Sequence, residues 1–522
     1  MSGLQDNARY DVAIVGFGPS GAVAAALLGQ AGVRTLVVDR SLAVYDRPRA
    51  IALDHEIMRV FQQLGLDEEI SRYCEPFTPS EYYGADGQLI KRLATVAPPY
   101  PLGHTPSMVF TQPEVERVLR AHVAALPSVT VALGQRLATL RQDADQATLL
   151  LMDDAGLQRS VHASYVIGCD GASSTVRDAV GITLEDLEFD EPWLVVDVQI
   201  NERGLVKLPK TSVQYCEPAR PCTYVIGPGM HRRWEISLLP DEDPAYMATE
   251  AGAWSALKRW ITPQDGALWR QASYRFHALV AREWRNGRVF VAGDAAHQQP
   301  PFLGQGMCQG VRDVANLVWK LRAALEGKGG EALLDSYGKE RGAHVRRLTA
   351  RIKDIGRVIC ERDPQRARER DAGLIAAAGG EIRTMARQDI IPPLEHGLLA
   401  GGGDGIELAP KSGVGTLFPQ PRLRQAQGPQ LMDQLAGCGW RVVTSLPAWS
   451  LPPALAARVE AFGTLVHVGP ETECDGVLAA WFARFACCAA IVRPDHYVYG
   501  VAATGEALAA LLDDWEARTV TV

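Results

Sequence analysis

The sequence lacks the cysteine spacing on which dithiol chemistry and most zinc sites depend. Its 10 cysteines are spread over 522 residues, no two of them have the C-x-x-C spacing, and only Cys487 and Cys488 are adjacent. This pattern predicts reduced thiols in the cytoplasm, with no disulfide framework and no metal site. A redox role for the adjacent pair is the weaker alternative, because neighbouring cysteines are poorly placed to pair with each other.

Long apolar runs and basic tracts are absent as well. No apolar run reaches the roughly 18 residues that span a bilayer, and residues 1–11 contain no apolar stretch of the signal-peptide kind. The net charge is -8 without a long Lys/Arg run, so neither a nucleic-acid partner nor a membrane anchor is expected. A chain of this length that is 47% hydrophobic and 22% charged is typical of a soluble protein with two or three domains.

Glycine is concentrated where the first strand meets the first helix. Residues 10–40 read as an apolar strand, a turn with Gly16, Gly18 and Gly21 in the G-x-G-x-x-G spacing, a helix, and a strand that ends in Asp39. These glycines allow a tight turn, a close approach to a pyrophosphate and close helix packing, and the helix N-terminus offers N–H groups to phosphates. The segment predicts a dinucleotide site without distinguishing FAD from NAD. We expect contacts from Gly16, Phe17, Gly18, Pro19, Ser20, Gly21, Asp39 and Arg40.

Two later segments have the same character of a strand followed by a turn. In residues 164–177 a strand leads to Asp170, Gly171 and a polar turn, which also fits a strand-to-helix turn capped by an Asp side chain. In residues 289–307, VFVAGDAAHQQPPFLGQGM, a strand leads to Asp294. A carboxylate there can bind a polyol hydroxyl, and a loop with a helix cap is the alternative interpretation.

The end of the third segment suits a ligand that gains negative charge. Pro300 and Pro301 make a stiff backbone with few donors. Gly304, Gly306 and Met307 then open a predicted helix, whose positive N-terminal end would face the ligand. That end would stabilise a carbonyl oxygen as negative charge develops on it.

Together, GFGPSG, CDGASSTVR and GDAAHQQPPFLGQGM, in this order, resemble the single-component FAD-dependent aromatic hydroxylases over nearly the whole chain. Within that family, FLGQGMCQGVRDVANLVWKL and QYCEPARPCTYV are most similar to 3-(3-hydroxyphenyl)propionate hydroxylases. The sequence departs from many relatives at Cys308, where they have Asn. We expect little effect, because backbone groups do the binding there.

The resemblance implies roles for individual residues. RPRAIALDHEIMRVFQQLGL resembles the family stretch whose arginine, here Arg49, approaches the FAD, and FTQPEVERVL resembles the helix whose glutamine, here Gln112, contacts it. An aspartate in the place of Asp294 binds the ribityl chain. The backbone that follows lies under the pyrimidine edge of the isoalloxazine. The remaining contacts implied for the cofactor or the reductant are those of Asp170, Gly171, Gly304, Gly306 and Met307.

The same resemblance implies the reaction. NADH or NADPH binds transiently and reduces a non-covalent FAD, O2 forms a flavin C4a-hydroperoxide, and a phenolic acid such as 3-(3-hydroxyphenyl)propionate is hydroxylated ortho to its hydroxyl. The protein positions the ring and excludes water. We expect Pro301 to form part of the wall and His297 to handle a proton, although His297 also fits a role in holding its loop. The alternatives are a hydroxylase of larger polycyclic phenols, another FAD oxidoreductase such as an oxidase or dehydrogenase, and a non-catalytic FAD-binding protein.

Residues 185 to 280 read as strands that could cover the substrate. In RRWEISLL, alternation puts Arg232 and Trp234 on one face and Arg233 and Glu235 on the other. If the first face lines the pocket, Arg232 pairs with a substrate carboxylate while Trp234 packs on the ring. An edge strand with solvated arginines is the alternative. Comparable substrate-binding candidates are Tyr215, Arg220 and Tyr224.

The predicted fold class is α/β, with a Rossmann-like FAD-binding domain, an inserted antiparallel substrate sheet and a C-terminal thioredoxin-like domain. The tail RPDHYVYGVA resembles the end of the thioredoxin-like domain of many of these hydroxylases. Without a C-x-x-C pair that domain has a structural or dimer-forming role, so a homodimer is expected. The predicted boundaries are 1–74, 106–182 and 281–395 for the FAD domain, 75–105 and 183–280 for the substrate sheet, 396–412 for a linker, and 413–522 for the tail.

Overall fold

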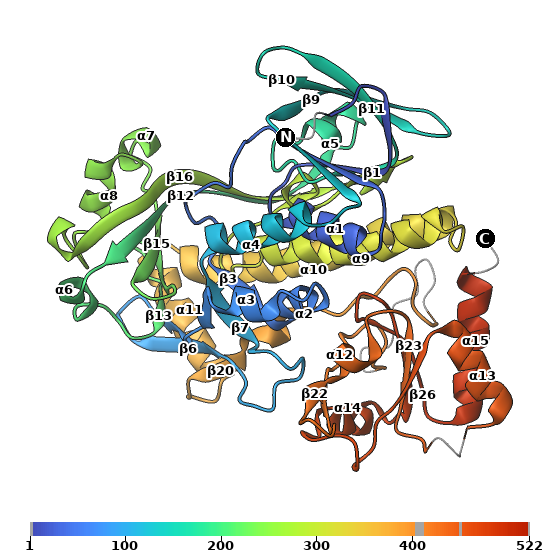
Figure 1. Cartoon of the computed structure of the whole chain (residues 1–522). Coiled ribbons are helices and arrows are strands. Elements are labelled where there is room, and N and C mark those ends of the chain that lie inside the picture. Colours follow the sequence, from blue (N-terminus) through green and yellow to red (C-terminus); the bar gives the residue numbers. More distant parts are fainter. Residues whose placement is uncertain (1–3, 402–411, 448–450, 520–522) are drawn as a thin grey trace.

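The computed structural model describes residues 4–401, 412–447 and 451–519, and three units can be distinguished in it (Figure 1). Most of the predicted linker, residues 396–412, lies outside the described residues. No helix in the described part of the chain is long and apolar enough to cross a bilayer.

The first unit is built on an eight-stranded sheet with the strand order β17-β18-β11-β1-β2-β8, and β10 joins β11 to β9. Strand β1 pairs in parallel with β2 and β11, and β11 pairs in parallel with β18. Parallel strands of this kind are buried on both faces and need helices to cover them. The strands are β1 (Ala8–Val15), β2 (Thr35–Asp39), β8 (Val129–Leu133), β9 (Gln135–Gln142), β10 (Ala147–Asp153), β11 (Gln158–Gly168), β17 (Arg285–Asn286) and β18 (Val289–Val291).

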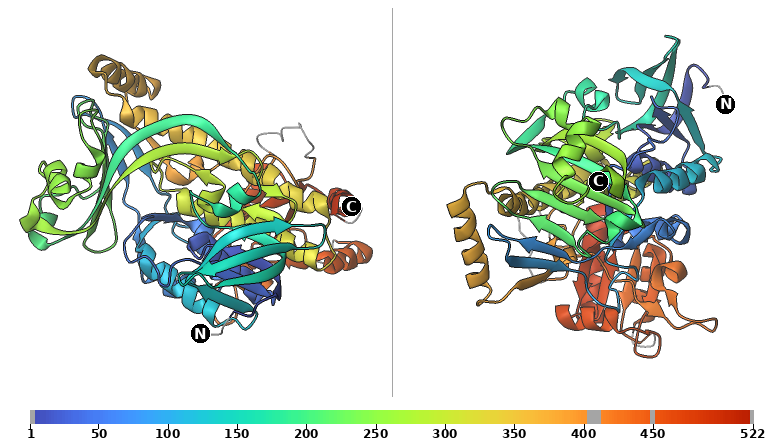
Figure 2. Two further views of the ribbon diagram at one scale, coloured as in Figure 1. Left: turned by 90° about the horizontal axis from the view of Figure 1, so that it is seen from above. Right: turned by 90° about the vertical axis from the view of Figure 1, so that its left-hand side faces the viewer.

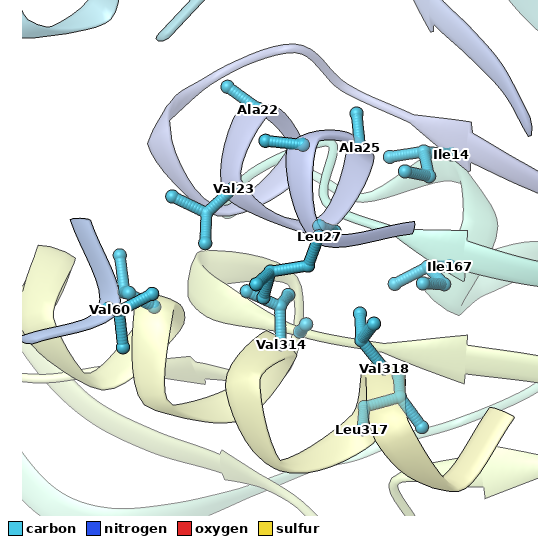
Figure 3. Packing of buried hydrophobic residues seen from close by; sticks show 14 of the residues in the cluster. Ile14, Ala22, Val23, Ala25, Leu27, Val60, Ile167, Val314, Leu317 and Val318 are labelled. Atoms are coloured by element: carbon cyan, nitrogen blue, oxygen red, sulfur yellow. The ribbon is translucent and has the colours of Figure 1, made fainter. Parts of the chain in front are cut away.

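Helix α1 (Pro19–Gln30) follows the glycine turn and is deeply buried in this unit's core. Its residues 22–26 have no exposed surface. Four of these five are alanines, so the helix can pack closely on its neighbours. Figure 3 shows Leu27 of α1 beside Val314 of α9, with Ile167 of β11 in the same cluster. The other elements of the unit are α2 (His55–Gln63), α3 (Asp67–Ser71), α4 (Gln112–Ala124), α5 (Thr175–Ala179), α9 (Gly306–Leu325), α10 (Glu331–Cys360), β3 (Ala52–Asp54), β4 (Cys74–Pro76) and β7 (Ser107–Phe110).

The second unit is a nine-stranded sheet with the order β19-β16-β12-β15-β14-β13-β5-β6-β20. Its long neighbours β12 and β16 form the curved pair that reaches away from the first unit in Figure 2. The sheet is mostly antiparallel, as predicted, but β13 pairs with β5 and β20 pairs with β6 in parallel. Its strands are β5 (Ser80–Tyr83), β6 (Leu89–Ala94), β12 (Leu184–Ile200), β13 (Ser212–Tyr215), β14 (Cys222–Ile226), β15 (His231–Ser237), β16 (Gly266–Ala281), β19 (His297–Gln298) and β20 (Arg383–Ala386).

Two of these strands come from residues that the sequence assigns to the FAD domain. Strand β19 pairs with β16, and β20 closes the far edge of the sheet against β6. Strand β19 has two residues and follows a three-residue 3₁₀ turn, and β20 follows a helix, residues 364–377, so nothing local in the sequence marks their pairing. The helices beside this sheet are α6 (Glu202–Leu205), α7 (Pro244–Met247), α8 (Glu250–Leu257) and α11 (Pro364–Ala377).

The third unit has a four-stranded sheet with the order β24-β23-β25-β26. Strands β23 and β24 are parallel, whereas β25 runs antiparallel to β23 and β26. The chain order β-α-β-α-β-β-α fits the predicted thioredoxin-like tail. The elements are β21 (Arg422–Leu423), β22 (Gln430–Leu431), α12 (Met432–Ala436), β23 (Arg441–Thr444), α13 (Pro453–Phe462), β24 (Thr464–His467), α14 (Val477–Phe485), β25 (Ala489–Val492), β26 (Val498–Ala502) and α15 (Gly505–Thr519).

Buried ion pairs join the third unit to the first. Arg493 places Nη2 2.6 Å from Glu340 Oε2 on α10 and 2.7 Å from Asp495 Oδ2. Lys320 on α9 lies 2.7 Å from the same Glu340 oxygen. Burial alone would raise the pKa of Glu340, but Arg493 and Lys320 lower it to about 2. The third unit is therefore held through a fully buried carboxylate.

We predict that Arg493→Ala will destabilise the attachment of the third unit by about 3–5 kcal/mol, because it leaves Glu340 buried with its main partner removed. Tryptophans line the cleft between the two units at positions 319, 440 and 515, so tryptophan fluorescence during urea unfolding is the measurement.

The matched control is Arg458→Ala, which removes an ion pair with Asp513, whose side chain is 68% exposed. We expect this change to cost under about 1 kcal/mol. Equal shifts of the urea midpoint for the two variants would contradict the role of Arg493.

Candidate active site

A cavity of about 380 Å³ lies where the glycine turn, the segment that follows β18 and the substrate sheet meet. It gathers side chains and backbone from segments far apart in the sequence. The predicted site residues that line it are Gly18, Pro19, Ser20, Arg49, Gln112, Gly171, Asp294, Pro301, Gly304, Gly306 and Met307.

A larger cleft, of about 1380 Å³, lies between the first and third units and contains none of the predicted site residues. Beside it, Asp433, Cys438 and His496 place possible ligand atoms within 4.8 Å of one another. Asp433 is already bound by Arg59, whose Nε lies 2.6 Å from Oδ2, and by Arg441. Two guanidinium groups at this carboxylate oppose a divalent cation, so we assign no metal to these residues.

The three glycines of the first turn have different surroundings. Gly16 has φ +105°, and a Cβ there would lie 2.2 Å from the Cys169 carbonyl oxygen. A Cβ on Gly21 would lie 1.9 Å from the Gly16 oxygen. A Cβ on Gly18 would meet no atom within 4 Å. The fold itself requires Gly16 and Gly21, whereas Gly18 leaves an open cradle at the N-terminus of α1.

Side chains around this turn fix its backbone and add positive charge. Asp39 accepts hydrogen bonds from the backbone N–H groups of Phe17 and Ser41, both at 2.7 Å. Arg120 on α4 lies 4.7 Å from the centre of the Phe17 ring, and its buried Nε and Nη1 have no hydrogen-bond partner. Arg40 is exposed and makes no hydrogen bond or ion pair with any described residue. The sequence predicted a cofactor contact from Arg40, whereas the structure places Arg120 beside the turn.

Asp294 lies in a short 3₁₀ turn, residues Gly293–Ala295, directly after β18. Its side chain is exposed to the cavity and forms no hydrogen bond with any described residue, and desolvation by the surrounding protein raises its pKa. The preceding Gly293 has φ +62° and donates its N–H to Asp313 Oδ2 at 2.9 Å. Asp313, which the sequence reading missed, thus holds the turn that presents Asp294.

His297 helps Asp313 to hold this turn and does not form part of the cavity wall. Its Nε2 lies 2.8 Å from Asp313 Oδ2, and the residue is only 1% exposed. Arg341 donates from Nε to the other Asp313 oxygen at 2.9 Å. His297 is not among the residues that line the cavity. The structure therefore supports the alternative interpretation, in which His297 holds the loop, and not the predicted proton transfer to substrate.

The opposite wall of the cavity is the proline segment and the start of α9. Pro301 and Phe302 line the cavity, and α9 begins at Gly306 with its N-terminus toward it. Gln299 also lines the cavity, and its buried Oε1 and Nε2 have no hydrogen-bond partner. The wall thus combines an apolar, donor-poor surface with the positive end of a long helix.

Arg49 and Gln112 are coupled to each other. Gln112 Oε1 accepts hydrogen bonds from the backbone N–H of Arg49 at 3.1 Å and from that of Ala50. Gln112 Nε2 donates to Glu116 at 2.6 Å, and Glu116 lies 3.6 Å from the Arg49 guanidinium. The Gln112 side chain thus fixes the loop that carries Arg49, in addition to lining the cavity.

Asp170 supports the start of α5 through its side chain, as the alternative interpretation of a strand-to-helix turn expects, although the N-cap residue itself is Ser174. Its Oδ1 accepts from the Ser174 hydroxyl at 2.5 Å, and its Oδ2 accepts from the Val176 N–H at 3.1 Å, at the start of α5. Asp170 itself does not line the cavity, but its neighbours Cys169 and Gly171 do, and Gly171 has φ +85°. The Asp170 side chain therefore positions the Gly171 turn.

The substrate sheet presents the opposite face from the one predicted. Trp234 has no exposed surface, and its ring centre lies 5.1 Å from that of Tyr224. Both belong to a cluster on the outer side of the sheet with Leu257 of α8 and Met247 of α7. The apolar face of β15 is therefore covered by helices, and its polar face lines the cavity. Alternation alone could not decide which face the helices cover.

The other substrate-binding candidates are also placed away from the cavity. Arg232 donates from Nη1 to the carbonyl oxygens of Gly229 and His231. Arg220 forms a two-pronged ion pair with Glu242, with both N···O distances 2.7 Å. Tyr215 packs on the outer side of the sheet with the cluster of Trp234. None of Arg232, Trp234, Tyr215, Arg220 and Tyr224 lines the cavity, so their assignment to the substrate pocket is corrected.

The face of β15 that lines the cavity carries Arg233 and Glu235, which the sequence did not assign to the substrate pocket. Arg233 binds the buried Asp197 of β12, with Nε 2.7 Å from Oδ1, and donates from Nη1 to the Arg49 carbonyl oxygen at 2.8 Å. Arg270 of β16 donates to the Pro48 carbonyl oxygen at 2.7 Å and lies 3.5 Å from Asp197. Burial alone would raise the pKa of Asp197, but Arg233 holds it below its ordinary value. This cluster fastens the substrate sheet to the loop that carries Arg49.

The cavity fits FAD on several independent grounds. The cradle at Gly18 and the N-terminus of α1 suit a pyrophosphate. The unpartnered carboxylate of Asp294 suits a polyol hydroxyl, and the unpartnered amide of Gln299 lies in the same cavity. The N-terminus of α9 suits a ring oxygen that gains charge.

We predict that Gly18→Ala will fold normally but bind FAD about tenfold or more weakly, because the added methyl group enters the cradle and not the protein core. Circular dichroism of the apoprotein checks the fold, and a flavin fluorescence titration measures FAD affinity. Gly21→Ala is the control and should lose thermal stability even without FAD. Unchanged FAD affinity in Gly18→Ala would exclude this cradle as the phosphate site.

Comparison with known proteins agrees with this geometry. A family model described as FAD binding domain matches residues 9–352, and one described as HcaD C-terminal domain matches residues 415–517. A probable NADH-specific resorcinol 4-hydroxylase from Rhodococcus jostii (strain RHA1) is 36% identical over 525 residues, which are 98% of this chain and 96% of that protein. A 3-(3-hydroxy-phenyl)propionate/3-hydroxycinnamic acid hydroxylase from Mycobacterium sp. (strain JLS) is 33% identical over 95% of this chain and 90% of that protein.

Solved structures share the fold over almost the whole chain. The flavin-dependent monooxygenase PieE, solved with FAD and substrate, superposes with a TM-score of 0.82 at 21% identity, over 99% of this chain and 100% of that one. Aklavinone-11 hydroxylase, solved with FAD and aklavinone, has a TM-score of 0.79 at 22% identity over the same shares of the two chains. These matches confirm the predicted fold class, and the sequence matches confirm the predicted family. The chain belongs to the family of FAD-dependent aromatic hydroxylases.

Proposed function

We propose that the protein hydroxylates a phenol with a single aromatic ring, ortho to a hydroxyl group, using NADH and O2. The observation that carries this proposal is that one cavity contains both the predicted FAD-binding backbone and the polar side of the substrate sheet. A cavity of about 380 Å³ that also admits the flavin ring favours one aromatic ring over several. Larger polycyclic phenols are therefore the less favoured substrates.

When bound, FAD supplies the activation of O2, and the residues of this chain hold and shield it. The cradle at Gly18 receives the pyrophosphate, and Asp294 accepts hydrogen bonds from the ribityl hydroxyls. The N-terminus of α9 stabilises negative charge on the ring. Pro301 and Phe302 keep water from the reacting atoms, which favours ring hydroxylation over release of hydrogen peroxide.

NADH is the reductant that we propose, although the chain has no second glycine turn of the dinucleotide-binding kind. A transient reductant needs no domain of its own, because it leaves before the aromatic ring reacts. The relative from Rhodococcus jostii is named as NADH-specific, which supports NADH over NADPH.

Two substrates have specific support. The sequence resemblance and the Mycobacterium relative favour 3-(3-hydroxyphenyl)propionate, and the buried Nε of Arg270, which has no hydrogen-bond partner, could receive its carboxylate. The Rhodococcus relative favours resorcinol, a dihydroxybenzene without a carboxylate.

We expect the purified FAD-loaded protein to consume NADH in air several times faster when its phenol is present, with nearly one hydroxylated product for each NADH. The assay follows NADH absorbance, hydrogen peroxide and product by chromatography, with resorcinol and 3-(3-hydroxyphenyl)propionate in parallel. NADPH in place of NADH is the control for the reductant. If neither phenol stimulates NADH use or yields a hydroxylated product, the proposed function is wrong.

A further inference from the structure

One carboxylate on the pocket face of the substrate sheet receives no side-chain hydrogen bond from the part of the chain that the structure describes. Glu235 lines the cavity, is 5% exposed, and accepts no side-chain hydrogen bond from any described residue. Its ion-pair partner is Arg233, but the contact is long, with Nη1 4.0 Å from Glu235 Oε1. A buried carboxylate in this state favours any ligand that brings a donor to it.

The sheet register places Glu235 in a polar row. Gln214 of β13 is paired with Thr223 of β14, and Thr223 is paired with Glu235 of β15. All three line the cavity, and Thr223 donates to Gln214 Oε1 at 2.6 Å. The next residue across the sheet, Val195 of β12, is apolar. The row therefore ends in a carboxylate beside an apolar surface, which suits an aromatic ring that carries a hydroxyl.

The arginines of the same sheet already have partners inside the protein. Arg233 binds Asp197 through Nε and Nη2, at 2.7 and 3.2 Å, and also donates to the backbone carbonyl oxygens of Arg49 and Pro48. Arg270 shares Asp197, at 3.5 Å, and also donates to the Tyr274 hydroxyl. Arg270 keeps one buried Nε without a partner, and Arg387, which also lines the cavity, donates to the Leu303 carbonyl oxygen. A substrate carboxylate beside Glu235 would nevertheless place two negative charges next to each other in the same small cavity. The position beside Glu235 therefore disfavours an acid and favours a neutral donor.

The electrostatics of Glu235 agree with this geometry. Burial raises its pKa to about 7, while Arg233 acts in the opposite direction. Above that pH the side chain is an unshared acceptor, and a phenol hydroxyl is a good donor for it.

We propose that Glu235 accepts a hydrogen bond from the second ring hydroxyl of a dihydroxybenzene, and thereby selects a neutral substrate such as resorcinol over a phenolic acid. The inference rests on the proposed function and names the substrate class of that same site. A dihydroxybenzene has a hydroxyl to spare, since one activates the ring for attack at the ortho carbon and the other is free to be held by Glu235.

The test compares the FAD-loaded protein with Glu235→Gln at pH 8. Binding of resorcinol is measured from the change in flavin absorbance without NADH, and kcat and KM are measured with NADH. We expect the variant to lose on the order of tenfold to a hundredfold in resorcinol affinity, mainly through KM. It should keep or improve its use of 3-(3-hydroxyphenyl)propionate, because a negative charge has been removed.

The control variant is Glu191→Gln, which removes a carboxylate of β12 whose pKa burial also raises but which does not line the cavity. It should behave as the parent protein. A second probe, 3-methoxyphenol, lacks the second hydroxyl donor. The parent should bind it about tenfold or more weakly than resorcinol, and Glu235→Gln should remove most of that difference.

The outcomes separate this inference from the proposed function. If the parent hydroxylates either phenol but Glu235→Gln weakens both phenols equally, Glu235 does not read the hydroxyl and the inference is overturned. A parent enzyme that prefers 3-(3-hydroxyphenyl)propionate to resorcinol overturns it as well. If the parent hydroxylates neither phenol, the proposed function itself fails, and the inference fails with it.

Discussion

The ion pair between Asp197 and Arg233 is the interaction on which the geometry of the active site depends. Asp197 has no exposed surface, and its two oxygens lie 2.7 and 3.2 Å from Arg233 nitrogens. Arg233 in turn donates to the Arg49 carbonyl oxygen, and Arg270 donates to that of Pro48. One buried carboxylate thus aligns two strands of the substrate sheet with the loop that lines the cofactor side of the cavity.

The pairing of Asp197 with Arg233 also explains why Glu235 has no close partner in the pocket. Two arginines and one aspartate would leave the wall positively charged, and Glu235 supplies the second acid without forming a close pair of its own. A buried carboxylate without a close partner raises its pKa, and its energy falls when a ligand donor arrives. Glu235 is therefore the group that can recognise a ligand hydroxyl, because no described residue donates a side-chain hydrogen bond to it.

Helix α9 connects this site with the rest of the molecule. Its N-terminus faces the cavity, and Asp313, two turns along, holds the turn that presents Asp294. Further along, Lys320 binds the Glu340 carboxylate that also receives Arg493 of the third unit. The third unit thus stabilises the first through the same helix that supports the cofactor side of the cavity.

The sequence predicted the parts of the site whose chemistry is local. The glycine turn, Asp294 and the opening of α9 each sit within one strand, turn and helix, so spacing alone located them. Arg120 and Asp313 act across the fold, and their roles depend on which helices pack beside the turns. The substrate face was predicted wrongly for the same reason: alternation in β15 gives two faces, and only the packing of α7 and α8 determines that Trp234 is covered while Glu235 is presented to the cavity.

The most direct measurement is a crystal structure of the oxidised, FAD-bound protein soaked with resorcinol. The account predicts an aromatic ring between the flavin and the substrate sheet, with one hydroxyl within hydrogen-bond distance of a Glu235 carboxylate oxygen. A ring bound elsewhere, or one in the cavity whose hydroxyls bind only other groups, would contradict it.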